Sequence, residues 1–213
     1  MKQKIKVLNL YAGIGGNRKL WKNVDVTAIE YDEETANVYR HYFPKDKVIV
    51  TDAHQYLLEH FAEFDFIWSS PPCPSHSRIN ISGVRIKEYP DMKLYEEIIF
   101  LKQWFKGKWV VENVIPYYTP LIQGKIIDRH LFWSNFKIGL FEPKNRARIS
   151  MKNKKSDENK MFEKIFGYDL SSFKLKDKNK NLRNCVHPET GLYVFNCANN
   201  NYKNFVTKQE TLF

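Results

Sequence analysis

Short apolar runs alternate with helical patterns along the first two thirds of the chain. The apolar runs, rich in β-branched and aromatic residues, span 5–11, 24–31, 47–51, 64–68, 109–111 and 131–136. Apolar residues at helical spacing follow at 17–22, 33–42, 54–61 and 92–105. Alternating units of this size are typical of a mostly parallel sheet with helices on both faces. The predicted fold is therefore α/β and Rossmann-like, with its ligand at the carboxyl ends of the strands.

The pattern changes near Lys144, where Asn and Lys begin to dominate. Only 161–168 indicates a short helix in the part that follows, and 191–195 is predicted to return as a strand. We therefore predict a core over 1–143, a small basic segment over 144–190, and a C-terminal return and tail over 191–213.

Composition excludes several classes of protein. Of the 213 residues, 43% are hydrophobic and 15% aromatic, enough for a folded core rather than a disordered chain. No run approaches the roughly 20 apolar residues of a membrane helix, and the N-terminal residues 1–6 lack the apolar stretch of a signal peptide. The three cysteines lack the spacing of a disulfide framework, so a cytoplasmic location is expected.

Charge is distributed unevenly along the chain. The net charge is +10, and the segment from Lys144 to Arg183 holds 13 basic and 5 acidic residues. A basic block of this kind is expected of a protein that binds a polyanion. A solvated Lys/Asn-rich loop would have the same composition, so the charge alone leaves both interpretations open.

A glycine-rich turn follows the first predicted strand. It reads Leu10-Tyr11-Ala12-Gly13-Ile14-Gly15-Gly16, and its glycines permit a tight turn and a close approach to a ligand. The spacing differs from the dinucleotide fingerprint, which disfavours NAD. Glycines at a strand-to-helix turn also serve purely steric needs.

Acidic residues end the second and third predicted strands. Glu30 lies at the distance from the glycines that suits a carboxylate accepting from ribose hydroxyls, and Tyr31 beside it can pack on an adenine ring. Asp32 suits the cap of the next helix. Asp52 can accept from an adenine amino group or cap the helix that follows, and its position alone favours the cap.

The segment after the fourth strand reads Ser69-Ser70-Pro71-Pro72-Cys73-Pro74-Ser75-His76-Ser77. Adjacent prolines hold the loop extended and present Cys73 at the edge of the sheet, as a nucleophile requires. A buried structural cysteine is the alternative, but the neighbouring prolines and polar residues are a poor core environment. Glu112 ends the apolar strand Val110-Val111-Glu112-Asn113-Val114, where burial would raise its pKa and let it act as an acid.

These five segments, in this order, resemble the cytosine-C5 DNA methyltransferases. The family's glycine motif resembles 11–16, its Pro-Pro-Cys motif matches Pro71-Pro72-Cys73, and its Glu-Asn-Val motif is intact at Glu112-Asn113-Val114. The resemblance covers about residues 5–136. It implies a class I fold that binds S-adenosylmethionine, with no metal. The residues it places on the cofactor side are Tyr11, Gly13, Gly15, Gly16, Glu30, Tyr31, Asp52 and Pro71.

The chain departs from the family pattern at several points. Asn9 and Pro74 stand where the family usually has Asp and Gln. The family's Arg-x-Arg motif has two candidates, Arg129 before the 131–136 strand and the segment Arg146-Ala147-Arg148, and the first has the more suitable place. The motifs usual near the C-terminus are not recognisable, and the segment available for target recognition is small.

The resemblance implies methyl transfer to C5 of cytosine in DNA. Attack by the Cys73 thiolate on C6 would activate C5, with Glu112 donating to N3 and Arg129 adding electrostatic stabilisation. The target base would have to be flipped out or unpaired, and the segment from Lys144 to Arg183 would hold phosphates.

Three alternatives remain. The same residues would serve C5 methylation of RNA. An amino-methyltransferase is disfavoured, because Cys73 stands where its Ser-Pro-Pro-aromatic motif has a stacking ring and the Glu-Asn-Val motif would have no role. A catalytically silent DNA-binding accessory fits the unrecognised C-terminal motifs but not the intact Cys73 and Glu112.

The last five residues, Gln209-Glu210-Thr211-Leu212-Phe213, resemble the peptide by which bacterial replication proteins bind the sliding clamp. An ordinary polar tail would also match so short a pattern. A clamp contact through Gln209, Leu212 and Phe213 is the expectation.

Overall fold

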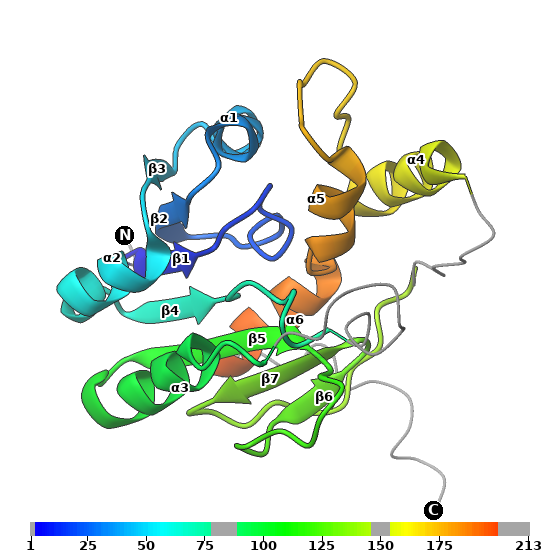
Figure 1. Cartoon of the computed structure of the whole chain (residues 1–213). Helices are drawn as coiled ribbons and strands as arrows, with labels where there is room; N and C mark the ends of the chain where they lie inside the picture. The colour runs from blue at the N-terminus through cyan, green and yellow to red at the C-terminus, as the bar shows by residue number, and fades with distance from the viewer. Residues whose placement is uncertain (1–2, 78–88, 146–153, 200–213) are drawn as a thin grey trace, which may run out of the picture.

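A seven-stranded sheet organises the chain in the computed structural model, which describes residues 3–77, 89–145 and 154–199. The strand order is β3-β2-β1-β4-β5-β7-β6 (Figure 1). The parallel strands are β1 (Ile5–Leu10), β2 (Val24–Glu30), β3 (Lys47–Val50), β4 (Phe66–Ser69) and β5 (Lys108–Val114). Two antiparallel strands, β7 (His130–Ser134) and β6 (Lys125–Ile127), extend the sheet beyond β5. This is a mostly parallel, Rossmann-like sheet, as the sequence predicts.

Helices cover both faces of the sheet. Their bounds are α1 (Glu33–Tyr42), α2 (Ala53–His60), the 3-10 turn η1 (Phe61–Glu63), α3 (Lys93–Trp104), α4 (Lys155–Phe166), α5 (Lys178–Asn184) and α6 (Pro188–Ala198). One core cluster joins α2 and α3 to the alternate positions Leu8 and Leu10 of β1. The other face is covered by α6, which packs with Val7, Val26 and Trp68, and by α1.

Capping explains where the first helices begin. Asp32 accepts from the Thr35 amide and Asp52 accepts from the Gln55 amide, so each aspartate satisfies a free N–H at a helix start. The capping role predicted for Asp32 is confirmed. Among the described residues no helix has the length and apolar character needed to span a membrane.

Most strand and helix predictions over 5–136 are confirmed within a few residues. The helix expected at 17–22 is wrong: the chain there forms turns, with Asn17 and Trp21 buried. The strand expected at 191–195 is also wrong, because these residues belong to α6. That helix starts at Pro188, in the first turn where its missing N–H costs nothing, and its apolar residues are buried almost all round.

The C-terminal third shares the core of the first two thirds. Phe162, Phe166 and Leu182 of α4 and α5 pack in one cluster with Ile14 and Val38. The indole of Trp21 donates to the carbonyl of Gly191 in α6 at 3.0 Å. The boundary at 144 therefore remains a prediction about chain organisation, since the two segments are packed together.

Candidate active site

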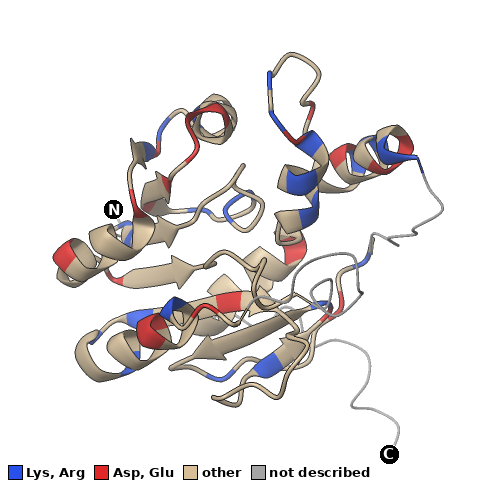
Figure 2. Cartoon of the chain, viewed as in Figure 1, with Lys and Arg blue, Asp and Glu red and all other residues tan. Residues whose placement is uncertain are grey.

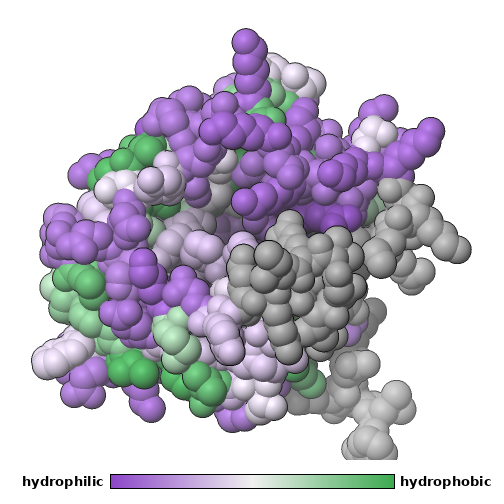
Figure 3. Space-filling model, in the orientation of Figure 1, coloured by the Kyte–Doolittle hydropathy of each residue, from purple (hydrophilic) through white to green (hydrophobic). Residues whose placement is uncertain are grey.

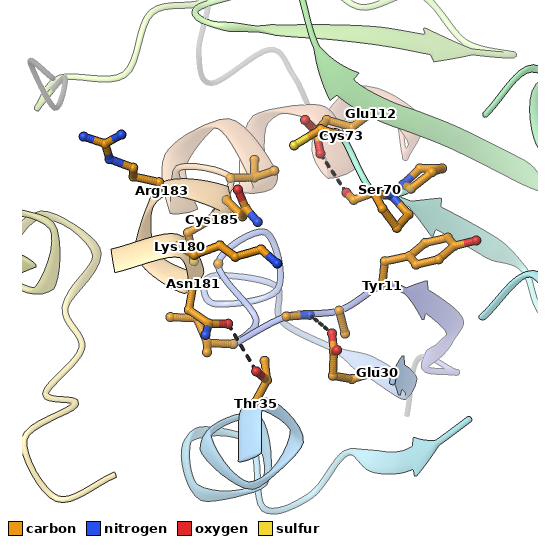
Figure 4. Close-up of a pocket in the computed structure, with 18 of the residues that line it drawn as sticks. Tyr11, Glu30, Thr35, Ser70, Cys73, Glu112, Lys180, Asn181, Arg183 and Cys185 are labelled. Carbon is orange, nitrogen blue, oxygen red and sulfur yellow. Dashed lines mark hydrogen bonds between the residues drawn. The ribbon is translucent and has the colours of Figure 1, made fainter. Parts of the chain in front are cut away.

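A cavity of about 640 Å³ opens at the carboxyl ends of β1, β2, β4 and β5. Its volume lies in the range of cavities that hold cofactors and small ligands. The glycine loop, the ends of β2 and β5, the Pro-Pro-Cys loop and α5 all contribute side chains (Figure 4). Every site residue predicted from the sequence and described in the structure lines this cavity, except Gly15.

The glycine loop is packed too tightly for side chains at two positions. Gly15 has a φ of +85°, and a Cβ there would lie 2.3 Å from the ring of Phe43. A Cβ on Gly16 would lie 2.6 Å from the sulfur of Cys185 and from the carbonyl of Val186. The first glycine thus allows the turn, and the second allows the C-terminal segment to approach the loop.

Glu30 holds the loop and retains acceptor capacity. Its Oε2 accepts from the Gly13 amide at 2.8 Å and its Oε1 accepts from the Asp32 amide at 3.0 Å. Each carboxylate oxygen has a second lone pair, which suits a pair of ribose hydroxyls. Tyr31 beside it is 78% exposed at the cavity wall, and Asp52 lines the cavity while capping α2.

Asn9, which departs from the family pattern, and Tyr11, which belongs to the glycine motif, are both held by local hydrogen bonds. Asn9 is fully buried and accepts from the amide of Asn17 at 2.7 Å, so a neutral amide pair ties β1 to the turn after the glycines. The Tyr11 hydroxyl turns away from the cavity and donates to Glu97 at 2.7 Å. Burial, and then the charge of Glu97, raise the pKa of this hydroxyl far above its usual range, so Tyr11 remains a donor.

The Pro-Pro-Cys loop is fixed to β5 by the Glu-Asn-Val motif. The Asn113 amide donates to the Pro71 carbonyl at 3.0 Å. The amides of His76 and Ser77 both donate to the Cys73 carbonyl at 3.0 Å, which closes the turn after the cysteine. Cys73 is half-buried and its sulfur points into the cavity beside Glu112. Burial raises the pKa of the Cys73 thiol, and the charge of Glu112 raises it further.

Glu112 is 5% exposed and is held on both carboxylate oxygens. The Ser70 hydroxyl donates to Oε2 at 2.7 Å, and Nδ1 of His130 bonds Oε1. Sequence reasoning did not single out His130, because a histidine inside an apolar strand gives no signal without knowledge of its neighbour across the sheet.

Arg129 lies beside this pair. Its Nε donates to Nε2 of His130 at 3.1 Å, and its Nη2 donates to the carbonyls of Arg183 and Cys185. Burial lowers the pKa of the guanidinium. Arg129 therefore joins β7 to the loop after α5, while the alternative candidates Arg146 and Arg148 lie outside the described residues.

The wall opposite β4 and β5 comes from the C-terminal third, which sequence reasoning assigned to holding phosphates but not to lining the cofactor cavity. Lys176, Lys180, Asn181 and Cys185 all line the cavity. The Asn181 side chain accepts from the Thr35 hydroxyl at 3.2 Å, so α5 faces α1 across the cavity (Figures 1 and 4). The sequence signal that could have identified α5 is Asp177, because Asp is a common N-cap residue. Asp177 caps α5 by accepting from the Lys180 amide.

Basic side chains of the C-terminal third fall into two groups. One group stabilises the fold, and the other is exposed beside the cavity. Arg183 pairs with the buried carboxylate of Glu158, and Lys178 donates to the Leu170 carbonyl, so both stabilise the fold. Lys176 and Lys180 are exposed beside the cavity. Figure 2 shows basic residues dominating α5, and Figure 3 shows hydrophilic surface over α1, α4 and α5.

The model of the C-5 cytosine-specific DNA methylase family matches residues 5–115, more than half of the chain. The chain belongs to this family. The matched part contains the glycine loop, Glu30, Cys73 and Glu112, whereas Arg129 and α5 follow it in the sequence.

Two curated relatives each match part of this chain. The tRNA (cytosine(38)-C(5))-methyltransferase of Rattus norvegicus is 32% identical over 131 residues, which are 58% of this chain and 34% of that protein. Its counterpart from Mus musculus is 33% identical over 86 residues, 37% of this chain and 21% of that protein. The chain therefore spans about a third or less of the length of these curated relatives.

Solved structures that are similar to this chain include two methyltransferases. A DNMT2 variant from Spodoptera frugiperda is 26% identical with a TM-score of 0.39, covering 52% of this chain and 36% of that one. A SAM-dependent methyltransferase from Agrobacterium tumefaciens is 12% identical with a TM-score of 0.38, covering 56% and 41%.

S-adenosylmethionine is the cofactor of this family, and the cavity suits it. The paired amide contacts of Glu30 leave acceptors for a ribose, and the wall continues through the apolar residues Ala12, Ile14, Ala53 and Pro71. The groups of three or more His, Cys, Asp or Glu side chains that a metal would need are absent from the described parts of the chain.

Proposed function

We propose that this protein methylates C5 of cytosine in DNA through a covalent bond between the Cys73 sulfur and C6 of the base. The observation that carries the proposal is the meeting of Cys73, Glu112 and the Glu30 end of the cofactor site on one cavity. A nucleophile, an acid and a place for the methyl donor are the three groups that the reaction needs together.

Cys73 starts the reaction as a nucleophile. Its thiolate forms a bond to C6, the electrons of the C5–C6 double bond shift through the ring towards N3, and C5 becomes enamine-like. S-adenosylmethionine would supply an electrophilic methyl group to C5 and leave as S-adenosylhomocysteine. A base from solvent then takes the C5 proton, the electrons of that C–H bond restore the C5–C6 double bond, and the C6–S bond breaks to release the Cys73 thiolate.

Glu112 moves the proton that balances this charge. A protonated Glu112 donates to N3 as the sulfur adds to C6, and takes the proton back on elimination. Arg129 contributes positive charge beside the same site through its guanidinium, which the contacts to Arg183 and Cys185 hold in place.

A trapping experiment tests the proposal. With S-adenosylmethionine and an oligonucleotide containing 5-fluorocytosine, elimination is blocked and the enzyme should stay bound to the base. We expect a covalent adduct with the wild type and with Cys197→Ala, whose cysteine is buried in α6, and none with Cys73→Ala. No adduct on any DNA or RNA would favour the silent accessory.

RNA is the second candidate substrate, because the two curated relatives described above are named as tRNA methyltransferases. The same trapping reaction with duplex DNA, single-stranded DNA and tRNA carrying the fluorinated base compares them directly. Adduct formed only with tRNA would overturn the proposal of a DNA substrate and leave the role of Cys73 intact.

The basic wall of the cavity is proposed to hold phosphates of the substrate through Lys176 and Lys180. Binding should therefore weaken as salt rises, and the double variant Lys176→Gln/Lys180→Gln should show a smaller salt dependence. Gln209, Leu212 and Phe213 lie outside the described residues. A clamp contact through them remains a proposal, which a pull-down comparing the full chain with one lacking the last five residues would test.

A further inference from the structure

His130 is a buried polar residue whose contacts all lead to the proposed acid. It begins β7 and is 7% exposed. In the antiparallel pair, His130 lies opposite Val114 and Phe132 lies opposite Glu112. His130 and Glu112 are therefore diagonal neighbours on the same side of the sheet, within reach of each other's side chains.

Arg129 determines which nitrogen of His130 carries the proton. The Arg129 Nε–H donates to Nε2 of His130 at 3.1 Å. A guanidinium nitrogen cannot accept a hydrogen bond and does not lose its proton in proteins, so Nε2 must present its lone pair. The neutral ring therefore carries its proton on Nδ1, and Nδ1–H donates to Oε1 of Glu112.

Ser70 holds the other oxygen of Glu112 in a different way. The indole of Trp68 donates to Oγ of Ser70 at 2.9 Å, and Ser70 in turn donates to Oε2 of Glu112 at 2.7 Å. A hydroxyl can rotate and act as donor or acceptor, whereas the tautomer of His130 is fixed. The two oxygens of Glu112 are thus not equivalent.

We propose that His130 is a positioning residue that keeps Oε1 of Glu112 occupied as an acceptor, so that Oε2 is the oxygen that carries the proton to N3 of cytosine. This inference rests on the proposed function. When the Cys73 sulfur bonds to C6, the proton leaves Oε2 for N3, and it returns to Oε2 when the sulfur leaves. His130 keeps its Nδ1 proton throughout, because Arg129 occupies Nε2.

The charged and titratable groups around this pair come from four segments of the chain. They are Glu112 on β5, Asp128 and Arg129 in the β6–β7 turn, Cys73 in the loop after β4, and Lys180, Arg183 and Cys185 in and after α5. The hydrogen bond from Arg129 needs a lone pair on Nε2 of His130, which only the neutral ring has. Protonation of His130 is therefore not part of the proposed cycle.

Two substitutions separate positioning from packing. In His130→Asn the side-chain amide can replace Nδ1–H as the donor to Glu112, while His130→Phe keeps a ring but no donor. We expect His130→Phe to slow adduct formation about 10- to 100-fold at saturating cofactor and oligonucleotide, the range seen when a supporting hydrogen bond to a reactive group is lost. His130→Asn should stay within about fivefold of wild type, as should the control His60→Asn at a partly buried position of α2 outside the cavity, with unchanged cofactor affinity in all three.

A second measurement does not depend on catalysis. Nitrogen-15 spectra of the histidine rings, with His130 assigned by its loss in His130→Asn, should show the Nδ1–H tautomer at neutral pH. An Nε2–H tautomer, or equal losses of rate in His130→Asn and His130→Phe, would overturn the inference. If the wild type forms no adduct while the spectrum shows the Nδ1–H tautomer, the proposed function fails and the fixed tautomer stands.

Discussion

Two buried glutamates lie on opposite sides of the sheet near the end of β4, and consecutive serines reach them. Ser69 donates to Glu97 at 2.5 Å and Ser70 donates to Glu112 at 2.7 Å, because successive residues of an extended chain point to opposite faces. Glu97 is fully buried and Glu112 is 5% exposed. Two glutamates with nearly the same burial are therefore bound to consecutive serines, one on each face of the sheet.

The difference lies in what surrounds each carboxylate. Glu97 accepts from Tyr11 and Ser69 and bonds His54, and it does not line the cavity. It joins α3 to the glycine loop, to α2 and to β4, so its role is structural. Glu112 lines the cavity beside Cys73 with one rotatable partner. A buried carboxylate is a candidate acid only where a substrate can reach it, so burial alone does not identify a catalytic group.

Among the substitutions, Glu112→Gln should have the largest effect on the rate of adduct formation and a small effect on stability. Gln can still accept from His130 and pack in the same space, but it cannot donate an acidic proton to N3. We expect adduct formation to slow by about 10²- to 10⁴-fold, the range for losing a general acid, with little change in melting temperature. Single-turnover trapping and thermal unfolding measure the two effects.

Glu63→Gln, in the η1 turn, is the matched control and should match wild type in both measurements. A large fall in melting temperature with an unchanged rate of adduct formation in Glu112→Gln would contradict the catalytic role of Glu112. Its role would then be structural, like that of Glu97.

Glu97→Ala should show the opposite profile. The substitution leaves the Tyr11 and Ser69 hydroxyls without their buried acceptor and His54 without its partner. We expect the free energy of unfolding to fall by about 3 kcal/mol, as when one member of a buried polar network is removed. Urea unfolding measures this loss.

Glu96→Gln provides the comparison for this change, since Glu96 precedes Glu97 on α3 but its side chain is 59% exposed. That variant should stay within about 0.5 kcal/mol of wild type. Equal stability of Glu97→Ala and Glu96→Gln would remove the structural role assigned to Glu97.

The two glutamates also differ in how far the sequence could predict them. Glu112 ends an apolar strand inside a recognisable motif, so its position alone indicates a use. Glu97 lies between Glu96 and Ile98 in a helix, and only the packing of α3 decides which glutamate turns inward. Local patterns therefore predicted the strands, the glycine loop and Cys73, which depend on neighbours in the chain.

The parts that the sequence did not predict depend on contacts distant in the chain. The partnership of Glu112 with His130 requires the register of β5 and β7, and the use of α5 as a cavity wall requires its packing on Ile14 and Val38. The short apolar run at 191–195 fits a strand or a buried helix equally well, and the structure has the helix. Whether Arg129 acts directly on the base stays a prediction.

The pH dependence of Cys73 alkylation, which needs the thiolate but no acid, should separate the glutamates again. The pKa of the Cys73 thiol is raised, first by burial and then by the charge of Glu112, so most of the protein is in the thiol form at neutral pH. The alkylation rate should therefore rise by about tenfold per pH unit up to the pKa of the thiol. Mass spectrometry of the Cys73 peptide after short exposures to iodoacetamide at several pH values measures the profile.

In Glu112→Gln the negative charge is gone, so the alkylation profile of Cys73 should move to lower pH. Glu97→Ala should leave the profile in place, because Glu97 does not act on the thiol. A shift in the second variant and none in the first would show that the Cys73 thiol responds to the structural carboxylate instead.

The smallest effect should come from His54, the partner of Glu97 on α2. The hydrogen bond to Glu97 raises the pKa of His54 above its ordinary value of about 6.5. The protonated form is thus favoured by folding, and its stabilisation is present below about pH 6.5 and is lost as pH rises through the higher pKa of the folded state. Unfolding free energies should therefore fall between about pH 6 and pH 8, by less than about 1 kcal/mol because His54 is partly exposed.

His54→Asn isolates this contribution, because Asn can donate to Glu97 at every pH but does not titrate. Urea unfolding of the variant should give a flatter curve than wild type above about pH 6.5, where His54 begins to lose its proton. Parallel curves would mean that the charge of His54 does not contribute, and Glu97 would then be held by the Tyr11 and Ser69 hydroxyls alone. In either case the alkylation profile of Cys73 should not change, since the His54 contacts lie on the face of the sheet opposite Glu112.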